Sequence, residues 1–282
     1  MMKKLILNDG HEIPVLGFGT YKAREQEGID AVVSAISNGY SLIDTASIYG
    51  NEEAVGKGSQ ESGVAREHVY ITTKLWRECL GYESTKIEFE KSLKRLKVDY
   101  LDLYLIHWPA NAKNYENWQK ANADSWRAME DLQAEGRIKS IGVSNFFVEH
   151  LEALFQTARV IPSINQLEFH PGYWQQDLVE YCKMKDIVVE SWSPLAKGKV
   201  FGNEVLKSIA EKHNKSVAQV CLRWVIQHQL VVIPKSSTPQ RIKENMEIFD
   251  FELTDTEMDS INALPKMGFS GEMPNSWPDI VK

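Results

Sequence analysis

Four ionisable side chains of different chemistry lie at or just after the ends of apolar runs in the first half of the sequence. Asp44, Lys74 and His107 end three successive runs, and Tyr49 follows Asp44 by five residues. Together they would supply a protonatable phenol, a cation that tunes it and a carboxylate that holds the cation. Each residue alone has a structural interpretation, since Asp44 could cap a helix and His107 could be a core histidine. The combination favours acid–base chemistry on a bound substrate.

A second polar cluster lies near the carboxyl end of the chain. Residues 235–241 end an apolar run and open a helical pattern, and they place Lys235 and Arg241 among several hydroxyl and amide donors. Two cations around a helix amino terminus are typical of an anion site. The alternative is a solvated basic patch on an acidic protein.

Three aromatic residues, Tyr21, Trp76 and Trp108, stand beside the same run ends and predict the wall of an apolar substrate cleft. Aromatic packing within the core is the alternative. Two polar segments punctuated by Gly or Pro, 110–123 and 265–282, are expected to be mobile covers over this cleft. The first contains Tyr115 and Trp118, and the second contains Trp277.

The elements that must position these side chains alternate along the chain. Short runs rich in Val, Ile and Leu predict strands, and amphipathic patterns between them predict helices. Ser216 with Gln219 and Thr254 with Glu257 predict capping boxes, and Thr238-Pro239 predicts a helix start. The eight predicted strands cover residues 15–20, 41–45, 69–74, 101–107, 138–144, 163–168, 187–192 and 231–236.

Eight strands in alternation with helices predict a single-domain (β/α)8 barrel over residues 1–282, with a short amino-terminal segment, 1–14, and a short tail, 265–282. All strands of such a barrel end at one rim, where active sites lie. The rival is an open doubly wound sheet, which normally carries a glycine-rich dinucleotide turn. Gly17-Phe18-Gly19 lacks the third glycine of that turn, and the stretch from Gly50 to Gly58 lacks the spacing and the hydroxyl of a phosphate loop.

The composition excludes several classes of function. A formal charge of −7 is the wrong sign for nucleic-acid binding. No apolar stretch is long enough for a signal peptide or a membrane span, and Cys79, Cys182 and Cys221 form no motif, so we expect a cytoplasmic protein. The seven histidines are dispersed, which predicts no metal site. We further expect a monomer, with neither nucleic acid nor membrane as a partner.

Six motifs resemble the aldo-keto reductase family in sequence and in order, over about residues 5 to 265. The likeness is strongest to its small bacterial branch, which includes glyoxal and 2,5-diketogluconate reductases. That family is a (β/α)8 barrel that binds NADPH without the dinucleotide turn. The motifs are Gly17-Phe18-Gly19-Thr20, Asp44-Thr45-Ala46 with Tyr49-Gly50-Asn51-Glu52, Thr73-Lys74-Leu75-Trp76, Leu105-Ile106-His107-Trp108-Pro109, Gly142-Val143-Ser144-Asn145-Phe146 and Ile233-Pro234-Lys235-Ser236.

The resemblance implies NADPH-dependent reduction of aldehydes, dicarbonyls or keto-sugars, with NADPH supplying the hydride. It implies a catalytic tetrad of Asp44, Tyr49, Lys74 and His107, in which Tyr49 gives the proton, Lys74 lowers the pKa of Tyr49, and His107 orients the carbonyl. It assigns Tyr21, Tyr49, Trp76, His107 and Trp108 to the substrate. It assigns Gly19, Thr20, Asp44, Ser144, Asn145, Gln166, Trp192, Ser193, Leu195, Lys235, Ser236, Ser237, Arg241, Glu244 and Asn245 to the cofactor.

Two readings compete with this one. Some members of the family serve as non-catalytic nicotinamide sensors, a role that would tolerate a damaged tetrad or add an interaction segment, and neither feature is present here. A barrel isomerase could use the anion site for a sugar phosphate, but this leaves Trp192 and the pairing of Tyr49 with Lys74 without a role.

Overall fold

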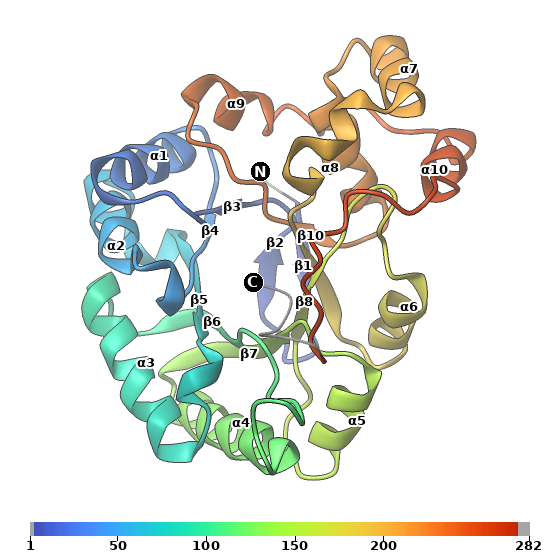
Figure 1. Cartoon of the computed structure of the whole chain (residues 1–282). Coiled ribbons are helices and arrows are strands. Elements are labelled where there is room, and N and C mark those ends of the chain that lie inside the picture. The colour runs from blue at the N-terminus through green and yellow to red at the C-terminus, as the bar shows by residue number, and fades with distance from the viewer. Residues whose placement is uncertain (1–2, 276–282) are drawn as a thin grey trace.

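The computed structural model of the protein describes residues 3–275. Eight parallel strands form one sheet that closes into a barrel (Figure 1). Leu16 bridges Val232 across the seam, and the Val232 amide donates to the Val15 carbonyl at 2.9 Å. The predicted (β/α)8 barrel is therefore confirmed. Its strands are β3 (Gly17–Gly19), β4 (Leu42–Asp44), β5 (Tyr70–Leu75), β6 (Leu101–Ile106), β7 (Ile138–Ser144), β8 (Ile164–Glu168), β9 (Val188–Trp192) and β10 (Val231–Val232).

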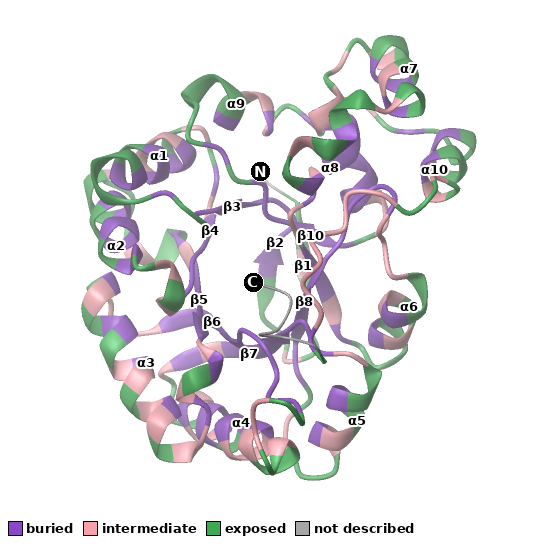
Figure 2. Ribbon diagram, in the orientation of Figure 1, coloured by how far each residue is buried: buried purple, intermediate pink, exposed green. Residues whose placement is uncertain are grey.

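The described chain contains ten α-helices. Those that surround the barrel have their buried faces toward the strands and their exposed faces outward (Figure 2). Both predicted capping boxes are present, at Ser216 and Thr254, and Pro239 opens α9 as predicted. The helices α7 and α10 pack against each other at the edge of the ring. The helices are α1 (Glu25–Ser37), α2 (Glu52–Glu61), α3 (Tyr82–Leu96), α4 (Trp118–Ala134), α5 (Val148–Phe155), α6 (Gln176–Met184), α7 (Glu204–His213), α8 (Val217–Gln227), α9 (Pro239–Glu244) and α10 (Asp255–Asn262).

The barrel strands are buried on both faces because one face lines the interior and the other packs against helices. All six residues of β6 are buried. Leu103 and Leu105 belong to the cluster that fills the interior, whereas Tyr104 and Ile106 belong to the cluster beneath the helices. Alternate residues of a strand therefore serve different layers, and the inward row also carries the polar groups of the rim.

A β-hairpin that the sequence analysis did not predict closes the amino-terminal end of the barrel. Strand β1 (Lys4–Ile6) pairs antiparallel with β2 (Glu12–Pro14), and the hairpin is visible through the ring in Figure 1. Leu7 and Ile13 join the interior cluster. The signal was present in Asn8-Asp9-Gly10, a turn sequence whose Gly10 has a φ of 85°.

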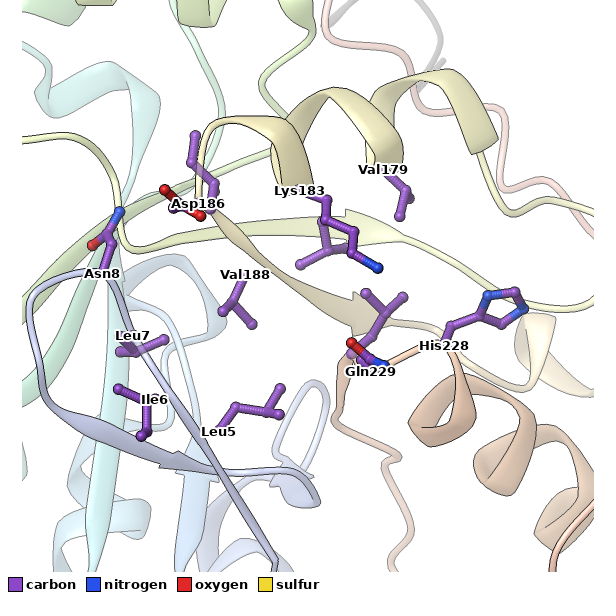
Figure 3. A pocket seen from close by; sticks show the side chains of 13 residues that line it. Leu5, Ile6, Leu7, Asn8, Val179, Lys183, Asp186, Val188, His228 and Gln229 are labelled. Atoms are coloured by element: carbon purple, nitrogen blue, oxygen red, sulfur yellow. The ribbon is translucent and has the colours of Figure 1, made fainter.

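A hollow beside this hairpin lies between β1, α6 and β9 (Figure 3). Leu5, Val179, Lys183, Val188 and Gln229 are among the residues that line it. No predicted site residue is among them, so the polar groups of the rim form a separate site. Within residues 3–275, every helix is too short or too polar to cross a bilayer.

Candidate active site

Asp44 and Lys74 form a buried ion pair at the carboxyl ends of β4 and β5. The strands are neighbours, and their register aligns Asp44 with Thr72, so both side chains enter the same end of the barrel. Lys74 Nζ lies 2.6 Å from Asp44 Oδ1 and also donates to the Thr45 carbonyl at 2.8 Å. Both residues are almost fully buried. The pair depends on its own hydrogen bonds because water contributes almost no solvation there.

Lys74 keeps its charge in this buried position. Burial by itself lowers the pKa of the ammonium group, but the charges of Asp44 and then of Tyr49 outweigh it, so the pKa of Lys74 is raised above its ordinary value. The site therefore holds a fixed cation at neutral pH.

Tyr49 lies over this cation at the end of a short 3-10 helix, Ser47–Tyr49. The Ser47 hydroxyl donates to the Lys74 carbonyl at 2.9 Å, and Gly50 ends the turn with a φ of 65°. The Tyr49 ring centroid is 5.1 Å from Lys74 Nζ. This turn therefore places the phenol beside the ion pair.

Burial and two nearby charges act on the pKa of Tyr49. Burial raises the pKa of the phenol to about 12, although the Lys74 charge lowers it as expected and the Asp44 charge raises it further. The effect of Lys74 is therefore in the expected direction, and burial outweighs it. Tyr49 is thus fully protonated at neutral pH and can donate a proton.

His107 follows β6 and faces both Tyr49 and an aromatic neighbour. Its backbone amide donates to the Leu75 carbonyl at 3.0 Å, and its ring centroid is 5.6 Å from Tyr49 and 5.4 Å from Trp76. Burial and then the charge of Lys74 hold the pKa of His107 well below its ordinary value. The imidazole is therefore neutral, and its Nδ1 is buried without a hydrogen-bond partner within residues 3–275.

The aromatic residues assigned to the substrate differ in how far they are exposed to solvent. Tyr21 is 52% exposed, and its ring centroid is 5.0 Å from that of Tyr49. Trp76 is half-buried beside His107. Trp108 is 5% exposed. Tyr21, Tyr49, His107 and Trp76 therefore form one continuous aromatic row at the mouth of the barrel.

The polar residues after β7, β8 and β9 form one connected group. The Ser144 hydroxyl donates to the Gln166 carbonyl at 2.9 Å, and the Trp192 indole N–H donates to Asn145 Oδ1 at 2.9 Å. Asn145 Nδ2 donates both to the His107 carbonyl and to Ser144 Oγ, each at 3.0 Å. Asn145 has a φ of 62°, which this short polar residue tolerates. The network ties residues at the ends of three strands to the main chain of His107.

Two residues at the end of β3 lie against the neighbouring backbone. The Gly19 amide donates to the Pro234 carbonyl at 3.0 Å, and a Cβ at Gly19 would lie 3.1 Å from the Ile233 carbonyl oxygen. The Thr20 hydroxyl donates to the Asp44 carbonyl at 2.9 Å. A side chain at residue 19 would thus crowd the Ile233 carbonyl, whereas the Thr20 hydroxyl supports the backbone at Asp44.

The segment after β10 presents two exposed cations, Lys235 and Arg241. β10 ends at Val232, so the strand is shorter than the predicted 231–236, and Lys235 lies in the following loop. The Ser236 hydroxyl accepts from the Thr238 amide at 3.1 Å and holds that loop. The other assigned residues are the exposed Ser237, the half-buried Glu244 and the buried Asn245, together with Ser193 and Leu195, which are half-buried after β9.

Glu190 is a buried site residue that the sequence analysis missed. It is 0% exposed, and its Oε2 accepts from Gln166 Nε2 at 2.7 Å. The same nitrogen donates to Asp44 Oδ2 at 2.9 Å. A carboxyl group within the apolar stretch Val188-Val189-Glu190, two residues before Trp192, was the signal that could have identified it.

The expected mobile covers are partly ordered by specific contacts. Trp118 begins α4, so the segment 110–123 is only partly a loop, and the Tyr115 hydroxyl donates to the Arg77 carbonyl at 2.5 Å. Ser270 donates to Glu168 through its amide at 2.9 Å and its hydroxyl at 2.7 Å. Asn111 Nδ2 donates to the Pro274 carbonyl at 2.7 Å. Trp277 lies outside the described residues.

These contacts bring the last described residues over one side of the site. A small cavity beside Asn145 and Trp192 is bounded by Glu272 and Pro274. Among residues 3–275, no three His, Cys, Asp or Glu side chains gather as metal ligands. The functional groups that the described site brings together are the Tyr49 phenol, the ion pair of Asp44 with Lys74, the His107 imidazole and the polar network around Asn145.

Comparison with known proteins agrees with this geometry. The profile described as Aldo/keto reductase family matches residues 15–266. Glyoxal reductase of Bacillus subtilis (strain 168) is 54% identical over 270 residues, which are 95% of each chain. An aldo/keto reductase of Brucella melitensis is 50% identical, with a TM-score of 0.88 over 93% of this chain and 98% of that one. A Gox0644 variant in complex with NADPH is 40% identical, with a TM-score of 0.90 over 97% of this chain and 98% of that one. The chain belongs to the aldo/keto reductase family.

Proposed function

We propose that this protein reduces small aldehydes and dicarbonyls to alcohols with NADPH, and that Tyr49 supplies the proton. One observation carries the proposal: a protonated phenol lies 5.1 Å from a buried ammonium group that a carboxylate holds at 2.6 Å, beside a neutral imidazole. Carbonyl reduction needs a hydride at carbon and a proton at oxygen, and bound NADPH supplies the hydride. Tyr49 and His107 are the groups positioned to act on the oxygen.

Tyr49 donates its proton as negative charge develops on the carbonyl oxygen, and Lys74 stabilises the phenolate that remains. Lys74 can do so because Asp44 keeps it charged. His107, being neutral, can donate one N–H to the same oxygen and orient it. The roles differ, so loss of Tyr49 removes the proton donor whereas loss of His107 misplaces the substrate.

The residues present fit a nicotinamide dinucleotide phosphate. Trp192 offers an aromatic face, and Ser144, Asn145 and Gln166 offer polar groups for a carboxamide. Both N–H groups of Asn145 are engaged, so the group that it can offer is its oxygen, which also accepts from the Trp192 indole N–H. Lys235 and Arg241 are exposed cations suited to the 2′-phosphate, with Ser236, Ser237, Glu244 and Asn245 nearby in sequence. Gly19, Thr20, Asp44, Ser193 and Leu195 complete the proposed cofactor residues.

The substrate class rests on the mouth of the site and on the relative from Bacillus subtilis, which is named a glyoxal reductase. The aromatic row of Tyr21, Tyr49, His107 and Trp76 provides an apolar wall that suits a small carbonyl compound. We propose that Trp108 also contributes to the substrate site.

The test is the initial rate of NADPH oxidation with glyoxal, methylglyoxal, simple aldehydes and keto-sugars, for the natural protein and Tyr49→Phe. Turnover that falls by at least about a hundredfold in Tyr49→Phe, with NADPH affinity retained, is the expected result. Binding of NADPH without reduction of any compound would favour a nicotinamide sensor and overturn the proposal.

We also propose that the protein is a cytoplasmic monomer. A charge of −7 opposes self-association, and the described structure contains three free cysteines, of which Cys182 and Cys221 are buried. Light scattering at several protein concentrations measures the mass directly, and a dimer mass would contradict the monomer.

A further inference from the structure

Glu190 is a carboxyl group buried inside the barrel for which the proposed mechanism gives no role. It lies on β9 in register with Gln166 of β8, and it is 0% exposed. Within residues 3–275, Glu190 Oε1 has no hydrogen-bond partner, and Oε2 accepts from Gln166 Nε2 at 2.7 Å. Burying a carboxyl group with one such bond opposes folding, so the residue invites a functional explanation.

Gln166 divides its two N–H groups between two carboxyl groups. One is directed to Glu190 and the other to Asp44 Oδ2 at 2.9 Å. A carboxylate can only accept hydrogen bonds, so Asp44 favours the nitrogen of the amide on its side. Glu190 accepts from the same nitrogen and holds it there. The orientation of the Gln166 amide is therefore fixed by its surroundings.

This orientation determines what Gln166 can offer a ligand. Both N–H groups are engaged, so its free group is the carbonyl oxygen, a hydrogen-bond acceptor. The carboxamide of nicotinamide carries an NH2 group that can donate to such an acceptor. We propose that Glu190 is a positioning residue that, through Gln166, selects a cofactor whose ring bears a carboxamide. This inference rests on the proposed function.

A purely structural role for Glu190 makes a different prediction. The charged and titratable groups that interact with it are Asp44 of β4 and Lys74 and Tyr70 of β5. If Glu190 served only to balance these groups, its loss would affect every cofactor equally. If it acts through Gln166, its loss affects only a cofactor whose ring can donate to Gln166.

The experiment compares two cofactors in three proteins. The cofactors are NADP+ and its 3-acetylpyridine analogue, in which an acetyl group replaces the carboxamide and removes the N–H donors. The proteins are the natural chain, Glu190→Met, which has no acceptor, and Glu190→Gln, which keeps an acceptor oxygen of the same size. Dissociation constants are measured by quenching of tryptophan fluorescence, and circular dichroism checks the fold.

We expect Glu190→Met to weaken NADP+ binding by about tenfold, as loss of one hydrogen bond does, and to leave analogue binding within about twofold. Glu190→Gln should keep the natural ratio of the two constants. An unchanged ratio in a folded Glu190→Met protein would overturn this inference alone. A natural protein that binds neither cofactor would overturn it together with the proposed function.

Discussion

The ammonium group of Lys74 lies 5.1 Å from the centre of the Tyr49 ring, and its charge favours the phenolate, whereas the charge of Asp44 opposes it. Burial opposes it and raises the pKa of Tyr49 to about 12. The Tyr49 phenol is therefore a weak acid before the reaction. Lys74 contributes most when the proton leaves, because it then stabilises the phenolate that forms.

Replacing Lys74 with Met removes the cation that stabilises the Tyr49 phenolate. We expect kcat for carbonyl reduction to fall by about a hundredfold or more, with little change in NADPH affinity. Stopped-flow absorbance of NADPH and fluorescence titration measure the two quantities. Lys57→Met is the matched control, because Lys57 is exposed and pairs with the nearby Glu61. Equal losses of rate in both variants would contradict the role of Lys74.

Replacing Asp44 with Asn should shift the alkaline limit of the reaction to lower pH. Asp44 raises the pKa of Lys74 and also that of Tyr49, so its loss lets both groups release a proton earlier. Either release removes a form that reduction requires. A profile of kcat/KM against pH checks this, and an alkaline limb that stays in place or moves upward would contradict it.

The barrel and the strand ends could be predicted from the sequence because they depend on local pattern. Asp44, Lys74 and His107 end apolar runs, and parallel strands bring such ends to one rim. The pKa of Tyr49 could not be predicted, because it depends on how much water reaches the hydroxyl after packing. Glu190 was missed since its partners, Gln166 and Asp44, come from distant parts of the chain.

The structure of the terminal segments also could not be predicted from local sequence pattern. The hairpin has a turn signal at Asn8-Asp9-Gly10, but its strands are three residues each, too short for an alternating pattern. The contact between Ser270 and Glu168 joins residues 102 apart in sequence, and no local pattern marks such a contact. Loops expected to be mobile can therefore be held by single side chains.

Replacing Lys235 and Arg241 with Ala should abolish preference for NADPH over NADH. Both cations are exposed, so solvent and salt partly screen their attraction to the 2′-phosphate. Their combined loss should therefore weaken NADPH binding by about tenfold to a hundredfold. NADH has no 2′-phosphate, so its affinity should not change. Lys243→Ala is the control, because Lys243 is an exposed cation on the same helix, α9. An unchanged ratio of affinities would refute the assignment.

Replacing Glu190 with Gln should change how stability depends on pH. Burial, and then the charge of Asp44, raise the pKa of Glu190 from 4.5 to about 8 in the folded protein. Between these values the folded chain keeps a proton that the unfolded chain releases. The resulting stabilisation is full below pH 4.5 and disappears as pH rises to about 8, at no more than about 1.4 kcal/mol per pH unit.

Glutamine cannot ionise, so Glu190→Gln lacks this slope, and its free energy of unfolding should increase relative to the natural protein from pH 5.5 to pH 7.5. Urea unfolding at the two pH values measures the difference. Glu53→Gln changes an exposed carboxyl group of α2 and should follow the natural protein at both. Parallel behaviour of Glu190→Gln and the natural protein would mean that Glu190 is already ionised at neutral pH, and that the barrel interior holds a second negative charge beside Asp44.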